Sequence, residues 1–373
     1  MTGLDDWPVL QGLFPAGWED LARSSGAVRR RLRGFSTIQA LLRTLLLHVG
    51  CGLSLRETAV EVGLAGIATV SDVALLNRLR DAETWLRQMC EALWRDNDVA
   101  LEPSFAGRSV RLLDATVIRE PGKTGSQWRL HFSLRLPTLE CDHFELTPTR
   151  GADVAERFGR FDFQAGELVL ADAGYCHAAG IAEVVAAKAD VCVRLNPYGL
   201  SLFDEQGQPF PLLKRISRVR RAGQPASWPV QILSGKTWIQ GRICAIRKSK
   251  QAIELAHKRL LRKKQQLKIK ATAESHTYAE YVLLFTTLPE AEASAAKMLE
   301  VYRLRWQVEL IFKRLKSIVQ MGHVPKYDPQ SCRAWLYGKL LVALLGQRLA
   351  SIGKSISPWG YLLPQDAHKQ PMA

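Results

Sequence analysis

The sequence has no Cys-x-x-Cys pair, no low-complexity tract and no unbroken apolar run long enough to cross a membrane. Its seven cysteines are odd in number and widely spaced, which argues against a disulfide framework and against a cysteine-rich zinc site. The start, MTGLDDWPVL, has neither a basic segment nor an apolar core, so it predicts no signal peptide. We therefore expect a cytoplasmic protein with reduced thiols and no membrane partner.

Acidic residues are scarce relative to basic ones, with 36 Asp and Glu against 51 Lys and Arg, and the net charge is +15. Such an excess favours a polyanionic partner, nucleic acid before anionic membrane, because each neutralised phosphate releases counterions. A basic protein with no such partner is the alternative, and charge alone does not decide between them. At 373 residues the chain can bury more than one core.

The apolar pattern predicts a helical N-terminal region at 1–100 and an α/β region from about 109 onward. Strands are expected at 110–113, 128–136 and 141–147, then a helix at 152–158, a strand at 168–171, a helix at 178–188 and a strand at 191–195. This alternation is typical of an α/β fold with a mixed sheet. The five expected parts are 1–100, 109–195, 196–279, 280–320 and 321–373.

The N-terminal region contains two short helix signals inside the longer apolar patterns at 38–49 and 75–93. Ser54 with Glu57 is a capping box, Gly63 and Gly66 suit a turn, and Ser71 is a second N-cap. Two such helices can form a helix-turn-helix. The residues that would then face DNA are Asn77, Arg78 and Arg80. Two packed helices with no DNA role would give the same pattern.

Residues 196–279 interrupt the alternation with turns, short β runs and two basic clusters. Of the 29 positions from Arg242 to Lys270, 11 are Lys or Arg, and a second cluster lies at 214–221. A charge run is usually a solvated face. Two runs in one inserted segment of a basic chain favour a DNA-tracking surface. A strand at 281–287 then returns to the core, and helices follow at 291–319 and 334–352.

Two aspartates stand at the expected ends of apolar strands. Asp114 closes RLLD and Asp172 closes LVLAD, which is followed by Gly174. Functional side chains gather at the carboxyl ends of strands in open α/β sheets, so the two carboxylates could share one site. Each could equally be a turn or helix-cap aspartate unless a third ligand exists.

The segment 300–319 supplies a third acid. In one continuous helix, at about 100° per residue, one polar edge would present Tyr302, Arg305, Glu309, Lys313 and Lys316. The adjacent arc would pack against the sheet through Leu304, Val308, Ile311, Phe312, Leu315 and Val319. An ordinary amphipathic helix with an i,i+4 Arg–Glu pair also fits this periodicity. An ordinary amphipathic helix does not explain why the polar edge carries a tyrosine and a single acid among three cations.

Three carboxylates can hold two divalent cations about 4 Å apart, an arrangement suited to in-line phosphoryl transfer. Oxygen ligands favour Mg²⁺ or Mn²⁺ over zinc. Arg305 and Lys316 would then bind backbone phosphates beside the scissile bond.

The spacing Tyr302-x2-Arg305-x3-Glu309-x6-Lys316 resembles the Tyr-Arg-Glu-Lys motif of the DDE transposases of bacterial insertion sequences, the IS-four family. Two further blocks agree with that family. They are Asp114-Ala-Thr-Val-Ile-Arg-Glu-Pro-Gly with Trp128-Arg-Leu-His131, and Asp172-Ala-Gly-Tyr175. The blocks lie in order over residues 109–345.

The resemblance implies an RNase H-like catalytic core with a β-rich basic insertion, a helical N-terminal domain and a helical C-terminal end. It implies that Asp114, Asp172 and Glu309 bind two Mg²⁺ ions, for which Mn²⁺ can substitute. It also implies that the protein nicks transposon ends and transfers the 3′-hydroxyl into target DNA by a cut-and-paste route. The implied partners are terminal inverted repeats, target DNA and a second copy in a synaptic homodimer. The implied location is the bacterial nucleoid.

Two features depart from the family pattern. Relatives that form a hairpin intermediate stack an aromatic of the insertion, usually Trp, on a flipped base. The matching residue here is Tyr281, which could equally be a strand aromatic in the core. The chain also ends soon after the helix at 334–352, without a long dimerisation region.

Two other functions stay open at this point. One is a transposase-derived DNA-binding protein that has lost its chemistry, against which the intact acidic triad counts. The other is a structure-selective nuclease on the same core.

Overall fold

The computed structural model describes residues 6–28, 32–95, 104–119, 127–136, 140–149, 156–317, 319–322, 324–325 and 328–354. The chain forms two compact units. Unit 1 comprises Met1–Asp98, Val117–Trp128 and Phe312–Ala373, and unit 2 comprises Val99–Thr116 and Arg129–Ile311. Helices near both ends of the chain therefore share one unit.

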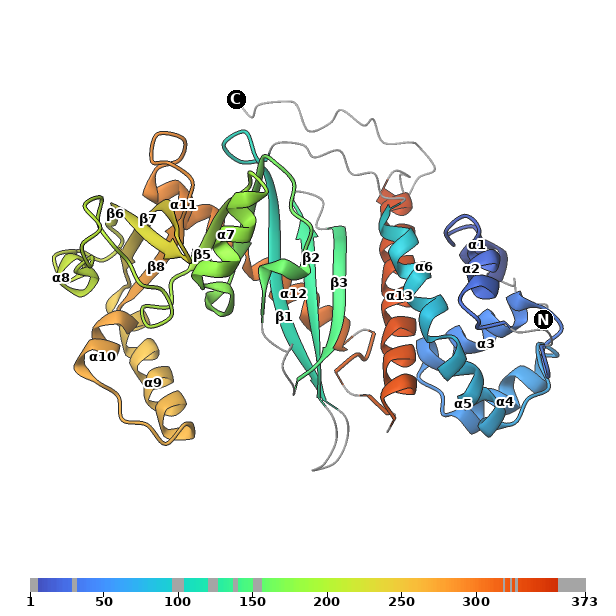
Figure 1. The fold of residues 1–373 in the computed structure, drawn as a ribbon. Helices are drawn as coiled ribbons and strands as arrows, with labels where there is room; N and C mark the ends of the chain where they lie inside the picture. Colours follow the sequence, from blue (N-terminus) through green and yellow to red (C-terminus); the bar gives the residue numbers. More distant parts are fainter. Residues whose placement is uncertain are drawn as a thin grey trace, which may run out of the picture. The chain divides into compact units, whose positions relative to one another are not determined.

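Unit 1 is built from helices (Figure 1). They are α1 (Trp7–Gln11), α2 (Trp18–Ser24), α3 (Ile38–Cys51), α4 (Leu55–Leu64), α5 (Asp72–Asp81), α6 (Glu83–Arg95) and α13 (Pro329–Lys354). The long helix α13 packs against α3, α5 and α6. The apolar pattern at 75–93 is divided between two helices, because α5 ends at Asp81, Ala82 is its C-cap, and α6 begins at Glu83.

The predicted caps of α4 and α5 are confirmed. Ser54 and Glu57 form a reciprocal capping box at the start of α4, and the Ser71 side chain accepts a hydrogen bond from Ala74 N at the start of α5. Gly63 belongs to α4 rather than to the turn. Gly66 lies in the turn with φ of 65°, a left-handed conformation that glycine adopts at little cost.

Unit 2 is organised around an eight-stranded mixed sheet with the order β3-β2-β1-β4-β5-β8-β7-β6. The strands are β1 (Ser109–Arg119), β2 (Gln127–Arg135), β3 (Glu140–Pro148), β4 (Glu167–Ala171), β5 (Asp190–Arg194), β6 (Pro225–Ser234), β7 (Thr237–Arg247) and β8 (Tyr281–Thr286). Strands β1, β4 and β5 are parallel, and β8, β7 and β6 continue the sheet in antiparallel pairs. This confirms the expected α/β class with a mixed sheet.

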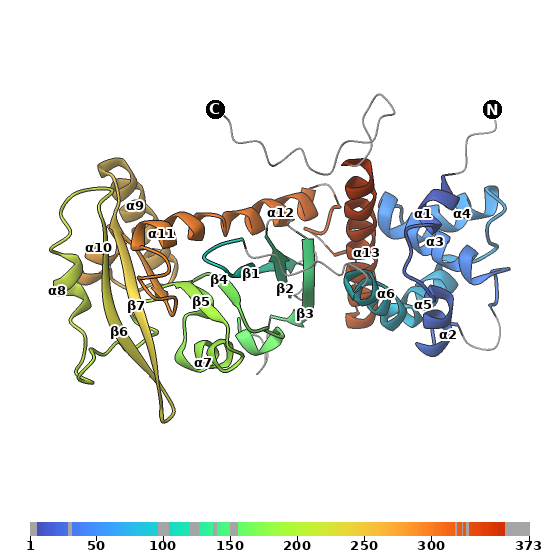
Figure 2. The same ribbon diagram turned by 90° about the horizontal axis from the view of Figure 1, so that it is seen from above.

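The helices of unit 2 cover the sheet and its edges. They are η1 (Phe158–Arg160), η2 (Ala173–Tyr175), α7 (Ala178–Ala186), α8 (Leu212–Ile216), α9 (Lys250–Gln266), α10 (Ala273–Ala279), α11 (Ala295–Arg303) and the start of α12 (Trp306–Ser317). Figure 2 shows α7 on one face of the sheet and α11 on the other. Of the helix expected at 152–158, residues 152–155 lie outside the described residues, and Phe158 begins the 3₁₀ turn η1.

The segment 196–279 is less β-rich than expected. It contributes the hairpin β6–β7, which joins the main sheet through β8, together with α8, α9 and α10. Most of the basic run from Arg242 to Lys270 is α9, a helix with no buried residue. Arg242 itself is buried, and its guanidinium donates to the carbonyl of Leu288.

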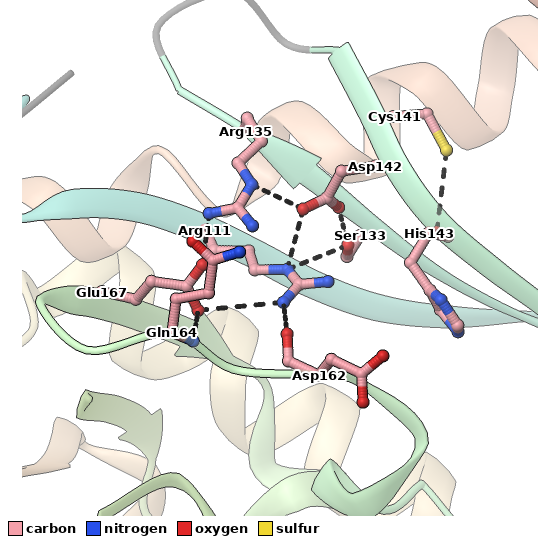
Figure 3. A network of polar contacts seen from close by, with 9 residues as sticks. All are labelled: Arg111, Ser133, Arg135, Cys141, Asp142, His143, Asp162, Gln164 and Glu167. Carbon is pink, nitrogen blue, oxygen red and sulfur yellow. Dashed lines mark hydrogen bonds and ion pairs between the residues drawn. The ribbon is translucent and has the colours of Figure 1, made fainter. Parts of the chain in front are cut away.

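A buried ion network joins the first residues of β1 and β4 to β2 and β3 (Figure 3). Asp142 lies between two guanidinium groups, 3.1 Å from Arg111 Nε and 2.5 Å from Arg135 Nε. Glu167 pairs with Arg135, and Arg111 donates to the carbonyl of Asp162 at 2.5 Å. Each charge in this network therefore has an opposite charge beside it.

All seven cysteines are free thiols. None of the helices in the described part of the chain is both long and apolar enough to cross a membrane.

Candidate active site

Asp114 lies on β1, beside the end of the parallel ladder. The ladder between β1 and β4 runs from Ser109 with Glu167 to Leu112 with Leu170. Asp114 and Asp172 each come two residues later, so they lie opposite one another at the same edge. The expectation that a strand ends at Asp114 is wrong, because β1 continues to Arg119. It is the pairing with β4 that ends there.

Asp172 follows β4 directly, as expected. The residues Leu168–Ala171 are apolar and buried, and the chain leaves the core at the next residue, Asp172. The Asp172 side chain caps the short turn η2 and accepts a hydrogen bond from Gly174 N at 2.7 Å. This bond fixes one carboxylate oxygen at the carboxyl edge of the sheet.

The single continuous helix expected at 300–319 is wrong. Helix α11 ends at Arg303 and α12 begins at Trp306, because the amides of Leu304 and Arg305 bond three residues back, to Val301 and Tyr302. This tighter turn moves Leu304 out of the apolar arc, and its side chain is exposed. Val308 and Phe312 are buried as expected.

Arg305, in the turn between α11 and α12, bridges two of the three predicted carboxylates. One guanidinium nitrogen lies 2.8 Å from Asp114 Oδ2, and another lies 2.8 Å from Glu309 Oε1. The side chains of Asp114 and Arg305 are 13% and 17% exposed, so this pair is shielded from solvent. Glu309, at 55%, is open to solvent. The structure thus brings a strand aspartate and a helix glutamate to one cation.

The acids of this site repel one another. Burial raises the pKa of Asp114 to about 6, and the negative charges of Asp172 and Glu309 add to that rise, although Arg305 opposes it. Burial acts against the charged form of Arg305, but Tyr302, Asp114 and Glu309 raise its pKa overall. The carboxylates therefore favour an additional cation at this edge of the sheet.

A fourth acid, Glu156, lies beside Asp172 and was not predicted. Burial raises its pKa to about 6, with Asp172 and Asp114 adding to the rise and Arg129 opposing it. Arg129 lies 3.3 Å from its carboxylate. Glu156 falls in the helix expected at 152–158, but in the structure it belongs to no strand or helix. The one sequence signal for it is Gly174, whose missing side chain leaves room for the Glu156 carboxylate.

Tyr302 lies in the protein interior rather than on an exposed polar edge. The residue is 8% exposed, and its hydroxyl donates to the carbonyl of Ala171 at 3.1 Å. Arg305 stacks over its ring at 5.9 Å. The exposed polar-edge position predicted for Tyr302 is therefore wrong, because its hydroxyl bonds α11 to the end of β4, next to Asp172.

Tyr281 is likewise a core residue. It is 5% exposed, and its hydroxyl donates to the carbonyl of Val219 at 3.3 Å. This burial favours the alternative of a core aromatic, because the ring as it lies is not open to a base, and the role of Tyr281 as a DNA contact stays a prediction. The two lysines predicted as DNA contacts lie on α12 beyond Ile311, in unit 1. Lys313 is exposed, and Lys316 is half-buried near Arg119.

The donor set suits a hard divalent cation. Asp114, Asp172 and Glu309 offer only oxygen atoms, which Mg²⁺ and Mn²⁺ prefer. Their excess charge already holds one cation, the Arg305 guanidinium. Within the described residues no three His, Cys, Asp or Glu side chains converge closely enough to share one ion. The fit of these three acids to such a metal thus rests on their oxygen donors and their negative charge, not on side chains already gathered around one ion.

Comparison with known proteins places this chain among enzymes of DNA mobility. A family described as "Transposase DDE domain" matches residues 147–345, which include Asp172 and Glu309. The transposase for insertion sequence element IS421 of Escherichia coli is 33% identical over 350 residues, 91% of this chain and 93% of that protein. InsL for insertion sequence element IS186A of Escherichia coli (strain K12) is 33% identical over 349 residues, with the same shares. The transposase for IS231B of Bacillus thuringiensis subsp. berliner is 20% identical over 369 residues, 89% of this chain and 77% of that protein.

Proposed function

Because the chain belongs to the DDE transposases of bacterial insertion sequences and is a DNA transposase, we propose that Asp114, Asp172 and Glu309 carry its strand-cleavage chemistry. Family membership implies dependence on a divalent metal in general. The finer proposal is two Mg²⁺ ions, for which Mn²⁺ substitutes, held by these three carboxylates.

The observation that carries the proposal is the bridge made by Arg305. Asp114 on β1 and Glu309 on α12 are 195 positions apart in the sequence, yet one guanidinium holds both at 2.8 Å. The parallel ladder brings Asp172 to the same edge. Three acids from three elements therefore lie at the edge where the ladder of β1 and β4 ends, which is where α/β proteins bind their ligands.

The proposed reaction is phosphoryl transfer in two steps. Bound divalent cations would lower the pKa of an attacking hydroxyl and stabilise the leaving 3′-oxygen. In the first step water attacks the phosphodiester at a transposon end, and a 3′-hydroxyl leaves. In the second step that 3′-hydroxyl attacks a target phosphodiester, so one bond is broken for each bond made. Asp114, Asp172 and Glu309 hold the reacting groups in line.

Arg305 and the lysines of α12 take different proposed roles. Arg305 positions Asp114 and Glu309, since its two ion pairs already use its guanidinium. Lys313, which is exposed, and Lys316 bind backbone phosphates. The buried Tyr302 supports the site from behind, through its bond to the residue before Asp172.

Recognition of the transposon ends is assigned to α4 and α5 as a helix-turn-helix. Asn77 is exposed on α5, and Arg78 is half-buried beside it. Arg80 is less suited to DNA, because it forms an ion pair with Asp328 at 2.9 Å. We assign the sheet and its flanking helices to an RNase H-like core, supported by the strand order and by the placement of the acids. A homodimer in the synaptic complex and action at the nucleoid complete the proposal.

Cleavage of linear DNA carrying the ends of the element tests this function. The wild type should nick the ends in Mg²⁺ and join the freed 3′-hydroxyls to a second DNA, whereas Asp114→Asn should do neither. Asp190→Asn is the matched control, because Asp190 also pairs with an arginine, Arg108, and its side chain is 19% exposed against 13% for Asp114. Undiminished cleavage by Asp114→Asn would refute the assignment. Cleavage of branched DNA without joining would identify a nuclease instead.

A further inference from the structure

Glu156 shares a small space with Asp172, although the family motif does not include it. A Cβ added at Gly174 would come within 1.6 Å of Glu156 Oε2 and within 3.0 Å of Asp172 Oδ1. Both carboxylates therefore approach the place where any other residue at 174 would carry a side chain. Glycine is required there for this close approach.

The two carboxylates are oriented by different partners. The amide of Gly174 donates to Asp172 Oδ1 at 2.7 Å. Arg129 pairs with Glu156 through Oε1 at 3.3 Å, while Oε2 is the oxygen nearest Gly174. The ion pair with Arg129 thus leaves the second oxygen of Glu156 turned toward Asp172.

A buried hydroxyl beside these acids indicates that a ligand belongs here. Tyr175 is fully buried, and the charges of Glu156, Asp114 and Asp172 all act on its phenol group. Its hydroxyl has no hydrogen-bond partner in the part of the chain that the structure describes. Buried hydroxyls are nearly always hydrogen-bonded, so a bound water or the hydration shell of a cation is expected at this place.

We propose that Glu156 is a fourth carboxylate of the metal site and shares a divalent cation with Asp172. The inference rests on the proposed function, since it requires that Asp172 binds metal. A cation between the two carboxylates would offset their repulsion, and a water bound to it would donate a hydrogen bond to the Tyr175 hydroxyl. Oxygen-only ligands favour Mg²⁺ or Mn²⁺.

Binding of Mn²⁺ to the full chain without DNA, measured by electron paramagnetic resonance and calorimetry, tests this proposal. Glu156→Gln should lower Mn²⁺ affinity by about tenfold, because one charged ligand is lost. Glu280→Gln is the matched control. Glu280 pairs with Arg247 at 2.9 Å, and its side chain is 24% exposed against 23% for Glu156. Its affinity should equal that of the wild type.

A second measurement separates a ligand from a merely structural partner of Arg129. Mn²⁺ should raise the melting temperature of the wild type and of Glu280→Gln more than that of Glu156→Gln. If Glu156→Gln does not fold, Glu156→Asp, which withdraws the carboxylate by one methylene, should show the same deficit. A structural role would lower the metal-free melting temperature but leave the rise caused by Mn²⁺ intact.

Asp172→Asn distinguishes failure of this inference from failure of the proposed function. If Asp172→Asn loses Mn²⁺ affinity while Glu156→Gln binds like the wild type, the role of Glu156 is overturned and the proposed function stands. If Asp172→Asn also binds like the wild type, the proposed metal site itself is wrong.

Discussion

The two ends of strands β1 and β4 carry charged residues with opposite consequences. At the amino ends, Arg111 and Arg135 enclose Asp142 and Glu167, so two positive charges meet two negative ones (Figure 3). Where the ladder between β1 and β4 ends, Asp114, Asp172, Glu156 and Glu309 face two cations among the described residues, Arg305 and Arg129. The first cluster is balanced, and the second carries an excess of two negative charges.

This difference separates a structural cluster from a functional one. A buried pair that is broken leaves an uncompensated charge, so the balanced cluster should matter for folding. An acidic cluster with fewer cations than carboxylates raises the pKa values of its own carboxyl groups and favours a bound cation, so it should matter for chemistry. The same strands thus hold the fold together at one end and present ligands at the other.

The largest expected effect is the loss of catalysis at the acidic end. Asp172→Asn should lower the rate of end cleavage in Mg²⁺ by about a thousandfold, because a ligand to the reacting groups is lost. Its melting temperature without metal should not fall, since the substitution removes repulsion. Cleavage rates and thermal melts of the same preparation measure both quantities. A variant that cleaves normally, or one that unfolds, would break the comparison.

The balanced end should respond in the opposite way. Glu167→Gln removes one of the two carboxylates that pair with Arg135 and Arg111, which leaves the buried cluster with one uncompensated positive charge, so we expect the free energy of unfolding to fall by about 3 kcal/mol. Urea denaturation measures this change. At a temperature where the variant is folded, its cleavage rate should match that of the wild type. A loss under 1 kcal/mol, about the value of a surface pair, would show that this cluster is not structural.

Replacing Arg305 tests the link between β1 and α12. Arg305→Ala should lower end cleavage by about tenfold, because Asp114 and Glu309 lose the group that positions them. Arg305→Lys should recover less than half of that loss, since an ammonium group cannot bridge two carboxylates in the same planar fork. Single-turnover cleavage measures both variants. Full activity of Arg305→Ala would remove the positioning role.

The last expected effect is a dependence of stability on pH. Burial raises the pKa of Asp114 from 3.8 in the unfolded chain to about 6 in the fold. The folded state therefore holds more protons in that window, and the contribution of Asp114 to the free energy of unfolding falls as the pH rises through it. Asp114→Asn should lack this fall. Without metal, the free energy of unfolding of Asp114→Asn should rise relative to that of the wild type between about pH 4 and about pH 6. Above that range the difference should stay level. A difference that is constant with pH would contradict this account.

Elements with an unbroken apolar pattern were predictable from the sequence. The run Leu168–Ala171 is buried throughout, and the first polar residue after it, Asp172, had to leave the core. The caps at Ser54 and Ser71 are likewise local, because their hydrogen bonds reach only three residues along the chain. The α/β class with a mixed sheet followed from such elements.

What the sequence could not predict depends on contacts between distant segments. The hydroxyls of Tyr281 and Tyr302 reach backbone carbonyls of other elements, which lets both polar aromatics be buried. The break at Leu304–Arg305 has no proline or glycine to signal it. The Glu156 carboxylate approaches Asp172 through the space left by the missing side chain of Gly174, and only the folded chain brings these residues together.

Anomalous X-ray scattering from crystals containing Mn²⁺ tests the central claim most directly, because it compares the two ends of β1 and β4 in one measurement. The account predicts Mn²⁺ density between Asp114 and Asp172, and none at the balanced cluster of Arg111, Asp142 and Glu167. Protein that cleaves transposon ends in the same Mn²⁺ buffer, but shows no metal density at the two aspartates, would contradict it.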